Sequence, residues 1–368
     1  MWGMNLSVGI VGLPNVGKST LFNALLEKQQ AYAANFPFAT IEPNIGVVPV
    51  PDERLGKLAD VVAESEIGVI PSLSRDLLRM QGCAGLRDPS AVPQDYKRRP
   101  PIVPATVEFV DIAGLVAGAS KGEGLGNKFL AHIREVDAIV HVLRGFSDEN
   151  VIRAGSTDPK SDLEIVKTEL DLADLETMER VKGKAEGGKG GNDNQGMPFL
   201  FKHKPFLVVL NVDENQLRSA SSLEEEFAAR VGLKKDQVIA ICAKTESELA
   251  GLGEEDAKIY LADLGGEQSG LERLIKKAFA TLGLITFLTA GVKEVRAWTI
   301  RRGETALRAS STIHTDFMQK FIKAEVVNFE DFVICGGWKG SREKGKARLE
   351  GKDYAMRDGD VVEFRIGS

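Results

Sequence analysis

The stretch Gly12-Leu-Pro-Asn-Val-Gly-Lys-Ser19 decides the fold, because it fits the pattern G-x-x-x-x-G-K-S/T of a phosphate-binding P-loop. An apolar, β-branched run at 6–11 predicts a buried parallel strand before it, and apolar residues at helical spacing in 20–26 predict a helix after it. A loop in this context presents backbone N–H groups to an anion. We therefore expect a nucleotide site in which Lys18 contacts the β- and γ-phosphates and Ser19 ligates Mg²⁺.

Length and composition indicate a cytoplasmic protein of two or three domains. The chain has 368 residues, 43% of them hydrophobic, and no apolar run reaches the roughly 18 residues of a membrane span. The first predicted strand starts close to the N-terminus, so we expect no signal peptide. Three scattered cysteines without a C-x-x-C pair disfavour zinc sites and disulfides. The net charge is −6, whereas residues 284–368 hold 15 Lys and Arg against 12 Asp and Glu, which indicates a separate partner surface there.

Strands and helices alternate along most of the chain, which predicts a doubly wound, mostly parallel sheet of the α/β class. Buried strands are expected at 6–11, 46–50, 106–111, 137–143, 205–211 and 237–242, and helices at 20–26, 52–64, 127–135, 161–183, 223–231, 254–264 and 270–282. Irregular sequence at 65–105 predicts a surface insertion, and the Gly-rich run at 186–196 predicts a flexible break.

The texture changes from Leu284 on, where a small α+β module is expected. Short β-branched runs surround one helical stretch, and Asp358-Gly359 is a turn signal before the last strand. The runs lie at 285–289, 295–300, 332–335 and 361–366, and the helical stretch lies at 315–322.

Polar residues follow the predicted strands at the edge where ligands bind in such sheets. Asp111 opens the pattern Asp111-x-x-Gly114, which fits the acid that holds Mg²⁺ through water in P-loop NTPases; a helix N-cap is the alternative. Thr40 lies between the first helix and the second strand, where GTPases place a hydroxyl that senses the γ-phosphate; a turn threonine is the alternative. Ser19, Thr40 and Asp111 are thus the predicted metal ligands.

Base recognition is predicted at Asn211-Val-Asp-Glu214, which resembles the N-K-x-D motif of GTPases but has Val212 for Lys and Glu214 for Asp. Guanine presents two adjacent donors to one carboxylate, whereas adenine presents one donor beside an acceptor. The longer Glu side chain need not occupy the guanine-reading position, so the pattern puts guanine preference in doubt and admits adenine. Cys242-Ala-Lys244 resembles the Ser-Ala-Lys loop that backs the base with main-chain N–H groups, which places Cys242 and Ala243 there.

Two residues near the phosphates bear on the rate of hydrolysis. Leu115 stands where Ras-like enzymes have the glutamine that positions the attacking water, and an apolar side chain cannot orient water. Intrinsic hydrolysis is therefore expected to be slow unless another group acts. Asn15 is a candidate ligand for a monovalent cation such as K⁺, with a turn-forming asparagine as the alternative. Lys18 and Asn15 are the predicted catalytic groups.

Together these motifs resemble the YchF family, a branch of the Obg-related translation-factor P-loop NTPases. The C-terminal part is similar to that family's TGS domain, a ubiquitin-like β-grasp module. The similar stretches are GLPNVGKST at 12–20, NFPFATIEPN at 35–44, FVDIAGLV at 109–116, KGEGLGN at 121–127 and Asn211-x-x-Glu214, followed by TAGVKEVRAWT at 289–299, IHTDF at 313–317, GKDY at 351–354 and DGD at 358–360.

The resemblance implies an α/β protein with a P-loop NTPase G domain, a helical insertion and a C-terminal α+β TGS domain. The G domain would comprise 1–144, with an irregular insertion at 66–99, and 201–283; the shortened helical insertion would comprise 145–200, and the TGS domain 284–368. It implies a Mg²⁺-dependent NTPase that tolerates or prefers ATP over GTP and acts in translation or stress regulation with the ribosome, through its large subunit, or with RNA. Phosphate contacts are implied for Gly12, Asn15, Val16, Gly17, Lys18, Ser19 and Thr20, and base contacts for Asn211 and Glu214.

The chain departs from the family pattern at two places. Residues 66–99 are extra sequence, and the Gly-rich run at 186–196 replaces the second arm of the helical insertion, which leaves RNA binding by the insertion open. Arg153, where some relatives have His, is assigned to the surface.

Two functions therefore stay open at this point: an NTP-hydrolysing switch on the ribosome, and an RNA- or protein-binding adaptor whose nucleotide is structural. A metabolic kinase is disfavoured because no base for an acceptor is visible. Basic clusters at Arg301-Arg302 and at 339–348 indicate either an RNA surface or a charge-mixed solvated face. We expect a monomer that does not associate with membranes.

Overall fold

The structure is a computed structural model that describes residues 6–35, 44–67, 99–112, 125–147, 158–186, 200–266 and 268–367. Contacts divide the chain into two compact units, which are described separately. The P-loop unit comprises Asn5–Val50 and Thr106–Leu282, and the C-terminal unit comprises Met1–Met4, Pro51–Ala105 and Gly283–Ser368. Thr40, Leu115 and Arg153, and most of 66–99 and 186–196, lie outside the described residues.

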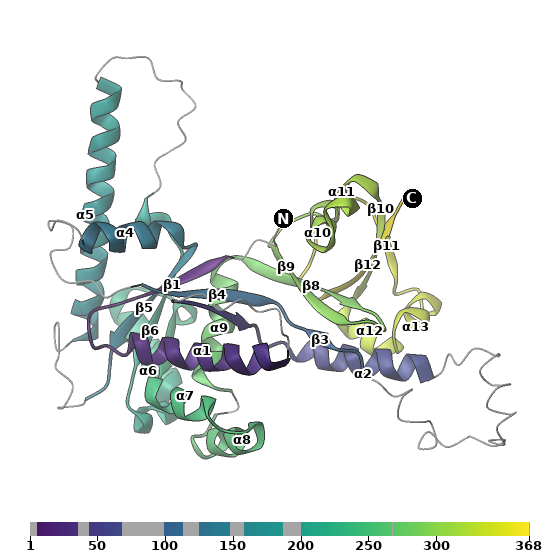
Figure 1. The fold of residues 1–368 in the computed structure, drawn as a ribbon, viewed down its shortest axis with the longest axis horizontal. Coiled ribbons are helices and arrows are strands. Elements are labelled where there is room, and N and C mark those ends of the chain that lie inside the picture. The colour runs from purple at the N-terminus through teal and green to yellow at the C-terminus, as the bar shows by residue number, and fades with distance from the viewer. Residues whose placement is uncertain are drawn as a thin grey trace, which may run out of the picture. The chain divides into compact units, whose positions relative to one another are not determined.

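A six-stranded, mostly parallel sheet forms the core of the P-loop unit (Figure 1). Its order is β2-β4-β1-β5-β6-β7, and β2 runs antiparallel to β4 at one edge. The central strands β5 and β6 are continuous apolar runs because both of their faces are covered, as expected for the predicted doubly wound sheet. The strands of this sheet are β1 (Ser7–Val11), β2 (Ile45–Pro49), β4 (Thr106–Asp111), β5 (Ala138–Arg144), β6 (Phe206–Asn211) and β7 (Val238–Ile241).

Helices cover both faces of this sheet. Leu163 of α5 and Phe227 of α6 join one apolar cluster with β6 and β7, whereas α9 begins against Ile241 on the opposite face. Lys28 of α1 forms an ion pair with Glu272 of α9 at 3.1 Å. The helices are α1 (Lys18–Asn35), α4 (Leu125–Glu135), α5 (Pro159–Glu186), α6 (Ala220–Val231), α7 (Ala243–Ala250), α8 (Glu254–Asp263) and α9 (Gly270–Thr281), with short 3-10 helices η3 (Phe201–His203), η4 (Glu214–Ser219) and η5 (Lys235–Gln237).

The helix α5 is the described part of the expected helical insertion. Its last turns extend away from the sheet (Figure 1), while Leu163 and Val166 near its start are buried. Within the described ranges, no helix combines the length and the apolar character that crossing a membrane requires.

The C-terminal unit has its own six-stranded sheet, in the order β11-β10-β12-β8-β9-β3. The β8–β9 hairpin is antiparallel, β12 pairs in parallel with β8, and β10 returns antiparallel to β12. A hairpin joined to a parallel partner at the centre of the sheet agrees with the expected β-grasp module. The strands are β3 (Ile102–Val103), β8 (Leu284–Ala290), β9 (Val295–Arg301), β10 (Phe321–Asn328), β11 (Arg348–Glu350) and β12 (Asp360–Ile366).

Each face of this second sheet also carries helices. Ala306 and Ala309 of α10 pack with Phe287 of β8 in the core of one face. Thr286 precedes Phe287 in β8, so its side chain lies on the opposite face of the sheet. It accepts a hydrogen bond from Arg54 of α2 at 2.8 Å, which places α2 on that face. The helices are α2 (Glu53–Ile67), α10 (Ala306–Ile313), α11 (Thr315–Lys320), α12 (Phe329–Cys335) and α13 (Trp338–Glu343).

The compact units follow contacts rather than chain order. The sequence assigned 1–144 to a single G domain, yet α2 and β3 belong to the C-terminal unit. β3 pairs in parallel with β9, and Arg54 reaches Asp358 at 2.8 Å, a residue 304 positions further along the chain. Such long-range pairings leave no mark in a local pattern, so the assignment by chain order could not include them.

The prediction of a β-run at 332–335 was wrong, because these residues form the end of the helix α12. The Asn328 side chain accepts a hydrogen bond from the Glu330 N–H and caps the helix start, and Gly336 ends the helix in the left-handed conformation at φ 73°. These caps outweigh the β preference of Val333 and Ile334. Likewise, the helix expected at 315–322 ends at Lys320, and β10 begins at the next residue.

Candidate functional site

The P-loop connects β1, at the centre of its sheet, to the N-terminus of α1. Gly17 adopts φ 96°, and a Cβ there would collide with the carboxamide of Asn211, so only glycine fits. Asn15 also lies in the left-handed region, at φ 61°, which asparagine tolerates better than most residues. The Leu21 N–H donates to the Gly17 carbonyl at 3.0 Å and closes the first helical turn. The loop conformation is therefore fixed by residues that the motif specifies.

Lys18 is the cation of this loop. Its ammonium donates to the Leu13 carbonyl at 2.8 Å, and the side chain is 8% exposed. Burial lowers the pKa of Lys18, and the nearby carboxylate of Asp111 partly counteracts this effect. A buried ammonium held by a loop carbonyl is placed to bind an anionic ligand at the helix N-terminus.

Asp111 ends β4, next to β1, where it lies in register with Ile10. Its Oδ1 atom is buried and accepts no hydrogen bond within the described chain. Burial raises the pKa of Asp111, and the positive charge of Lys18 lowers it. A buried carboxylate oxygen without a partner carries a large desolvation cost, which a bound cation or its water would offset.

These residues fit a magnesium ion. Ser19 is exposed in the first turn of α1, and Asp111 supplies an open carboxylate oxygen, so the donor set consists of hard oxygen ligands. The described residues contain no group of three His, Cys, Asp or Glu side chains that could hold a metal by itself. The ion would therefore need oxygen atoms from a bound phosphate, as Mg²⁺ does in nucleotide sites. Thr40, the third predicted ligand, lies outside the described residues.

Asn211 joins the phosphate loop to the predicted base loop. It is buried at the end of β6, its Nδ2 donates to the Val16 carbonyl at 2.9 Å, and its Oδ1 accepts from the Ala243 N–H at 2.9 Å. The Ala243 N–H, which the sequence assigned to the base, is thus used within the protein. Asn211 fixes the spacing between the two loops and keeps one amide hydrogen for a ligand. Cys242 is buried beside it with a free thiol.

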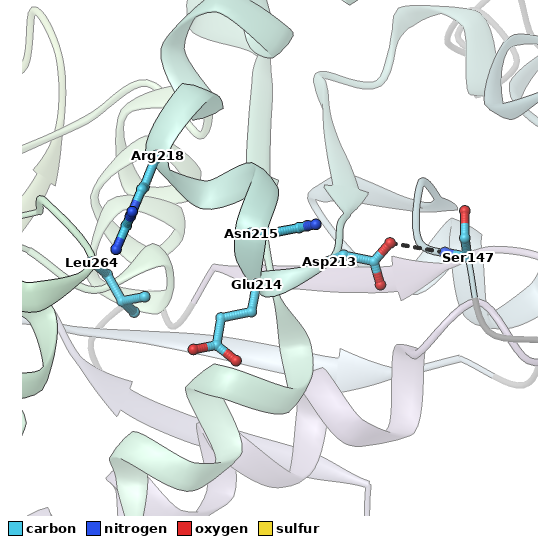
Figure 2. A pocket seen from close by; sticks show the side chains of 6 residues that line it. All are labelled: Ser147, Asp213, Glu214, Asn215, Arg218 and Leu264. Carbon is cyan, nitrogen blue, oxygen red and sulfur yellow. Dashed lines mark hydrogen bonds between the residues drawn. The ribbon is translucent and has the colours of Figure 1, made fainter.

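Glu214 lies at the start of η4 and lines a pocket of 680 Å³ (Figure 2). The Tyr260 hydroxyl donates to its Oε1 at 3.1 Å. Asp213 accepts a hydrogen bond from the Ser147 N–H at 3.0 Å, which ties η4 to the chain after β5. The pocket is lined by Ser147, Asp213, Glu214, Asn215, Arg218 and Leu264.

Sequence reasoning missed most of this pocket. Ser147 and Asp213 follow the carboxyl ends of two buried parallel strands, a position that could have marked them. Tyr260 and Leu264 come from α8 and the residue after it, and no motif indicated them. Among the sequence predictions, Lys18, Asp111, Asn211 and Glu214 all lie at one edge of the same sheet.

Part of the basic cluster at 339–348 is paired with acids. Arg342 contacts Glu325 at 2.8 Å and Glu363 at 2.7 Å. Lys346 pairs with Asp331 at 3.1 Å. This arrangement favours the charge-mixed face over a free cationic surface for the stretch 339–348.

The chain resembles known proteins over its whole length. The 50S ribosome-binding GTPase family model matches residues 7–177, and the YchF GTPase C-terminal family, described as a protein of unknown function, matches 284–367. The ribosome-binding ATPase YchF of Haemophilus influenzae is 44% identical, over 99% of both chains. That of Bacillus subtilis is 41% identical, over 99% of this chain and 100% of the relative.

A solved structure supports the same assignment. The YchF GTPase of Schizosaccharomyces pombe matches with a TM-score of 0.75 and 30% identity, over 99% of this chain and 100% of that one. The alignment with the Haemophilus relative spans 401 positions, more than the 368 residues of this chain. This chain therefore lacks some segments that the relative has. The chain shares 41–44% identity with these relatives over nearly its full length, and it matches two family models and a solved YchF structure. It therefore belongs to the YchF family.

Proposed function

We propose that this protein is a P-loop NTPase that binds and hydrolyses ATP, and GTP less well, as a Mg²⁺-dependent switch on the ribosome. The open Asp111 oxygen beside the buried Lys18 carries the proposal, because the carboxylate would hold a metal ion and the ammonium would bind phosphate oxygens. The relatives named ribosome-binding ATPase support the partner and the nucleotide.

Different residues would contact the phosphates, the metal ion and the base of the nucleotide. Lys18 would leave the Leu13 carbonyl for the β- and γ-phosphates, and the first turn of α1 would hold the phosphates with its N–H groups. Ser19 and Asp111 would hold Mg²⁺, which supplies charge neutralisation between the β- and γ-phosphates. Asn211 keeps the base loop at a fixed distance from this cradle.

Hydrolysis is proposed to be slow in the isolated protein. Leu115 cannot orient water, and Asn15, exposed in the loop, is a candidate for recruiting K⁺ as an additional positive charge. The switch would then dwell in its triphosphate form until a ribosomal partner accelerates turnover.

Co-sedimentation with ribosomes tests this proposal. We expect the full chain to pellet with ribosomes, through the large subunit, more strongly with a non-hydrolysable ATP analogue than with ADP or without nucleotide. Lys18→Ala should abolish that dependence, while Lys28→Ala, on the surface of the same helix, should keep it. Equal pelleting in all three nucleotide states would contradict the switch. Full binding by Lys18→Ala would instead support an adaptor with a structural nucleotide.

A further inference from the structure

The pocket beside the phosphate cradle contains a carboxylate that a neighbouring helix holds. Glu214 lines the pocket from η4, and Tyr260 of α8, itself no lining residue, donates its hydroxyl to Oε1 of Glu214 at 3.1 Å. The structure gives no donor for the other oxygen, Oε2, among the described residues. One oxygen of this carboxylate is thus occupied from within the protein.

The other acid of the pocket is already used. Asp213 accepts a hydrogen bond from the Ser147 N–H through Oδ2, and the Asp213 N–H donates to Gln216 Oε1 at 3.0 Å. In Figure 2, Asp213 and Asn215 point toward Ser147, whereas Glu214 points away from them. Glu214 is therefore the pocket carboxylate that no backbone N–H of the described residues engages, and its Oε2 is open to a donor from a ligand.

The two oxygens of Glu214 differ in availability, and guanine and adenine differ in how many donors they present to a carboxylate. The Watson–Crick edge of guanine places N1–H and N2–H side by side, so both are satisfied by a carboxylate with two open oxygens. Adenine offers only the N6 amino group as a donor on that edge, for which one oxygen suffices. The Tyr260 hydroxyl takes one acceptor position of Oε1, so it competes with the second guanine donor for that oxygen and leaves Oε2 open for adenine.

We propose that Tyr260 is a specificity-determining positioning residue, which occupies one oxygen of Glu214 and thereby disfavours guanine relative to adenine. This inference rests on the proposed function, since it places the base of the nucleotide at Glu214. It assigns selectivity to a residue of α8 that is distant in sequence from both nucleotide-binding loops.

The protonation state of Tyr260 agrees with this role. The hydrogen bond to Glu214 is the main cause that raises the pKa of Tyr260 above its ordinary value of 10.0. The hydroxyl is therefore protonated throughout the physiological range and remains a donor to the carboxylate.

Equilibrium titration of the full chain with ADP and with GDP, in the same Mg²⁺ buffer, tests the inference. We expect the wild type to bind ADP more tightly. Tyr260→Phe should lower the ratio of ADP to GDP affinity by about tenfold, mainly through tighter GDP binding, because Oε1 becomes available for a second donor. Tyr354→Phe removes a hydroxyl that bonds to Asp360 in the C-terminal unit and should leave the ratio unchanged.

A double-mutant cycle separates a specific role from a structural one. In a Glu214→Ala background, Tyr260→Phe should have no further effect on the ratio, because the hydroxyl then has no side-chain acceptor at position 214 through which to act. A ratio that stays within twofold in Tyr260→Phe, while both nucleotides bind, would overturn the role of Tyr260 and leave the proposed function standing. A wild type that binds neither nucleotide would overturn the proposed function itself.

Discussion

Two buried carboxylate oxygen sets, one in each unit, differ in whether the protein itself satisfies them. In the P-loop unit, the carboxylate of Asp111 has a buried oxygen that no described residue satisfies, next to the buried ammonium of Lys18. In the C-terminal unit, the buried carboxylate of Glu325 accepts hydrogen bonds from both Arg342 and Arg365. Buried polar groups are normally paired, so an open carboxylate oxygen beside a buried ammonium marks a candidate ligand site, whereas a fully paired carboxylate belongs to a structural network.

This contrast assigns different roles to the charges of the two units. The C-terminal unit is the more basic part by sequence, yet Arg342 and Arg365 are engaged with the buried acid Glu325 of its own sheet. The P-loop unit has fewer charges at its site, but they converge at the carboxyl ends of parallel strands, where the backbone also favours anions. Counting charges along the sequence would therefore have located the ligand in the wrong unit.

The largest expected effect comes from removing the cation of the open site. Lys18→Ala should weaken ATP binding by about 100-fold, because a charge-assisted contact to the phosphates is lost. Isothermal titration calorimetry measures this change directly. Lys28→Ala is the matched control, since it removes a lysine of the same helix that pairs with Glu272, and it should change the affinity less than twofold. Equal losses in the two variants would mean that α1, rather than the ammonium, sets the affinity.

The closed network should respond to pH instead of to ligand. The guanidinium of Arg342, followed by that of Arg365, lowers the pKa of Glu325 to about 2, although burial opposes the shift. Because the pKa is lower in the folded state than in the unfolded state, this carboxylate stabilises the fold above its ordinary pKa of 4.5, and the contribution is lost as pH falls toward 2.

Glu325→Gln should therefore cost about 2 kcal/mol of unfolding free energy at pH 7, and less at pH 3. Tryptophan fluorescence during urea unfolding reports on the right unit, because Trp298 and Trp338 both belong to it. Glu294→Gln, in an exposed pair with Arg296 at 3.8 Å, is the control and should have little effect. A loss that stays constant from pH 7 to pH 3 would contradict the ionic origin of the stabilisation.

A smaller loss of stability is expected when the hydrogen bonds of Arg54, which join α2 to the C-terminal unit, are removed. Arg54 donates to Asp52, Asp358 and Thr286 at 2.7–2.8 Å. Arg54→Ala should cost about 1 kcal/mol locally and speed amide exchange in α2 roughly fivefold. Hydrogen exchange read by mass spectrometry measures this, with Lys235→Ala, in an exposed pair with Glu225 of the P-loop unit, as control. Unchanged exchange in α2 would show that apolar packing alone holds the helix.

The sequence predicted the P-loop unit well because each element has a local signature there. The strands β4 and β6 end on Asp111 and Asn211, Cys242 follows the last residue of β7, and the topology brings such ends to one side of the sheet. The motif around Gly17 and Lys18 also specifies the loop conformation, through the left-handed glycine that Asn211 contacts. Pattern and structure agree where a few adjacent residues decide the outcome.

The rest depended on contacts that no local pattern contains. The helix α2 was predicted, but its unit was not, because Arg54 and Asp358 meet only in the folded chain. Two hydrogen bonds of the site also join residues that are distant in the sequence. Asn211 donates to the Val16 carbonyl of the P-loop, and the Tyr260 hydroxyl donates to Glu214. Pairing of distant polar groups therefore limits what could be inferred about the site from the sequence.

In the proposed function, the open carboxylate oxygen of Asp111 and the buried ammonium of Lys18 together bind a magnesium–nucleotide complex. Calorimetric titration of the full chain with a non-hydrolysable ATP analogue, with Mg²⁺ and then with a chelator, tests it most directly. We expect a single saturable site whose affinity falls by at least about tenfold without the metal, because the carboxylate of Asp111 is then left beside the phosphates uncompensated. Equal affinity under both conditions, or no binding, would contradict this account.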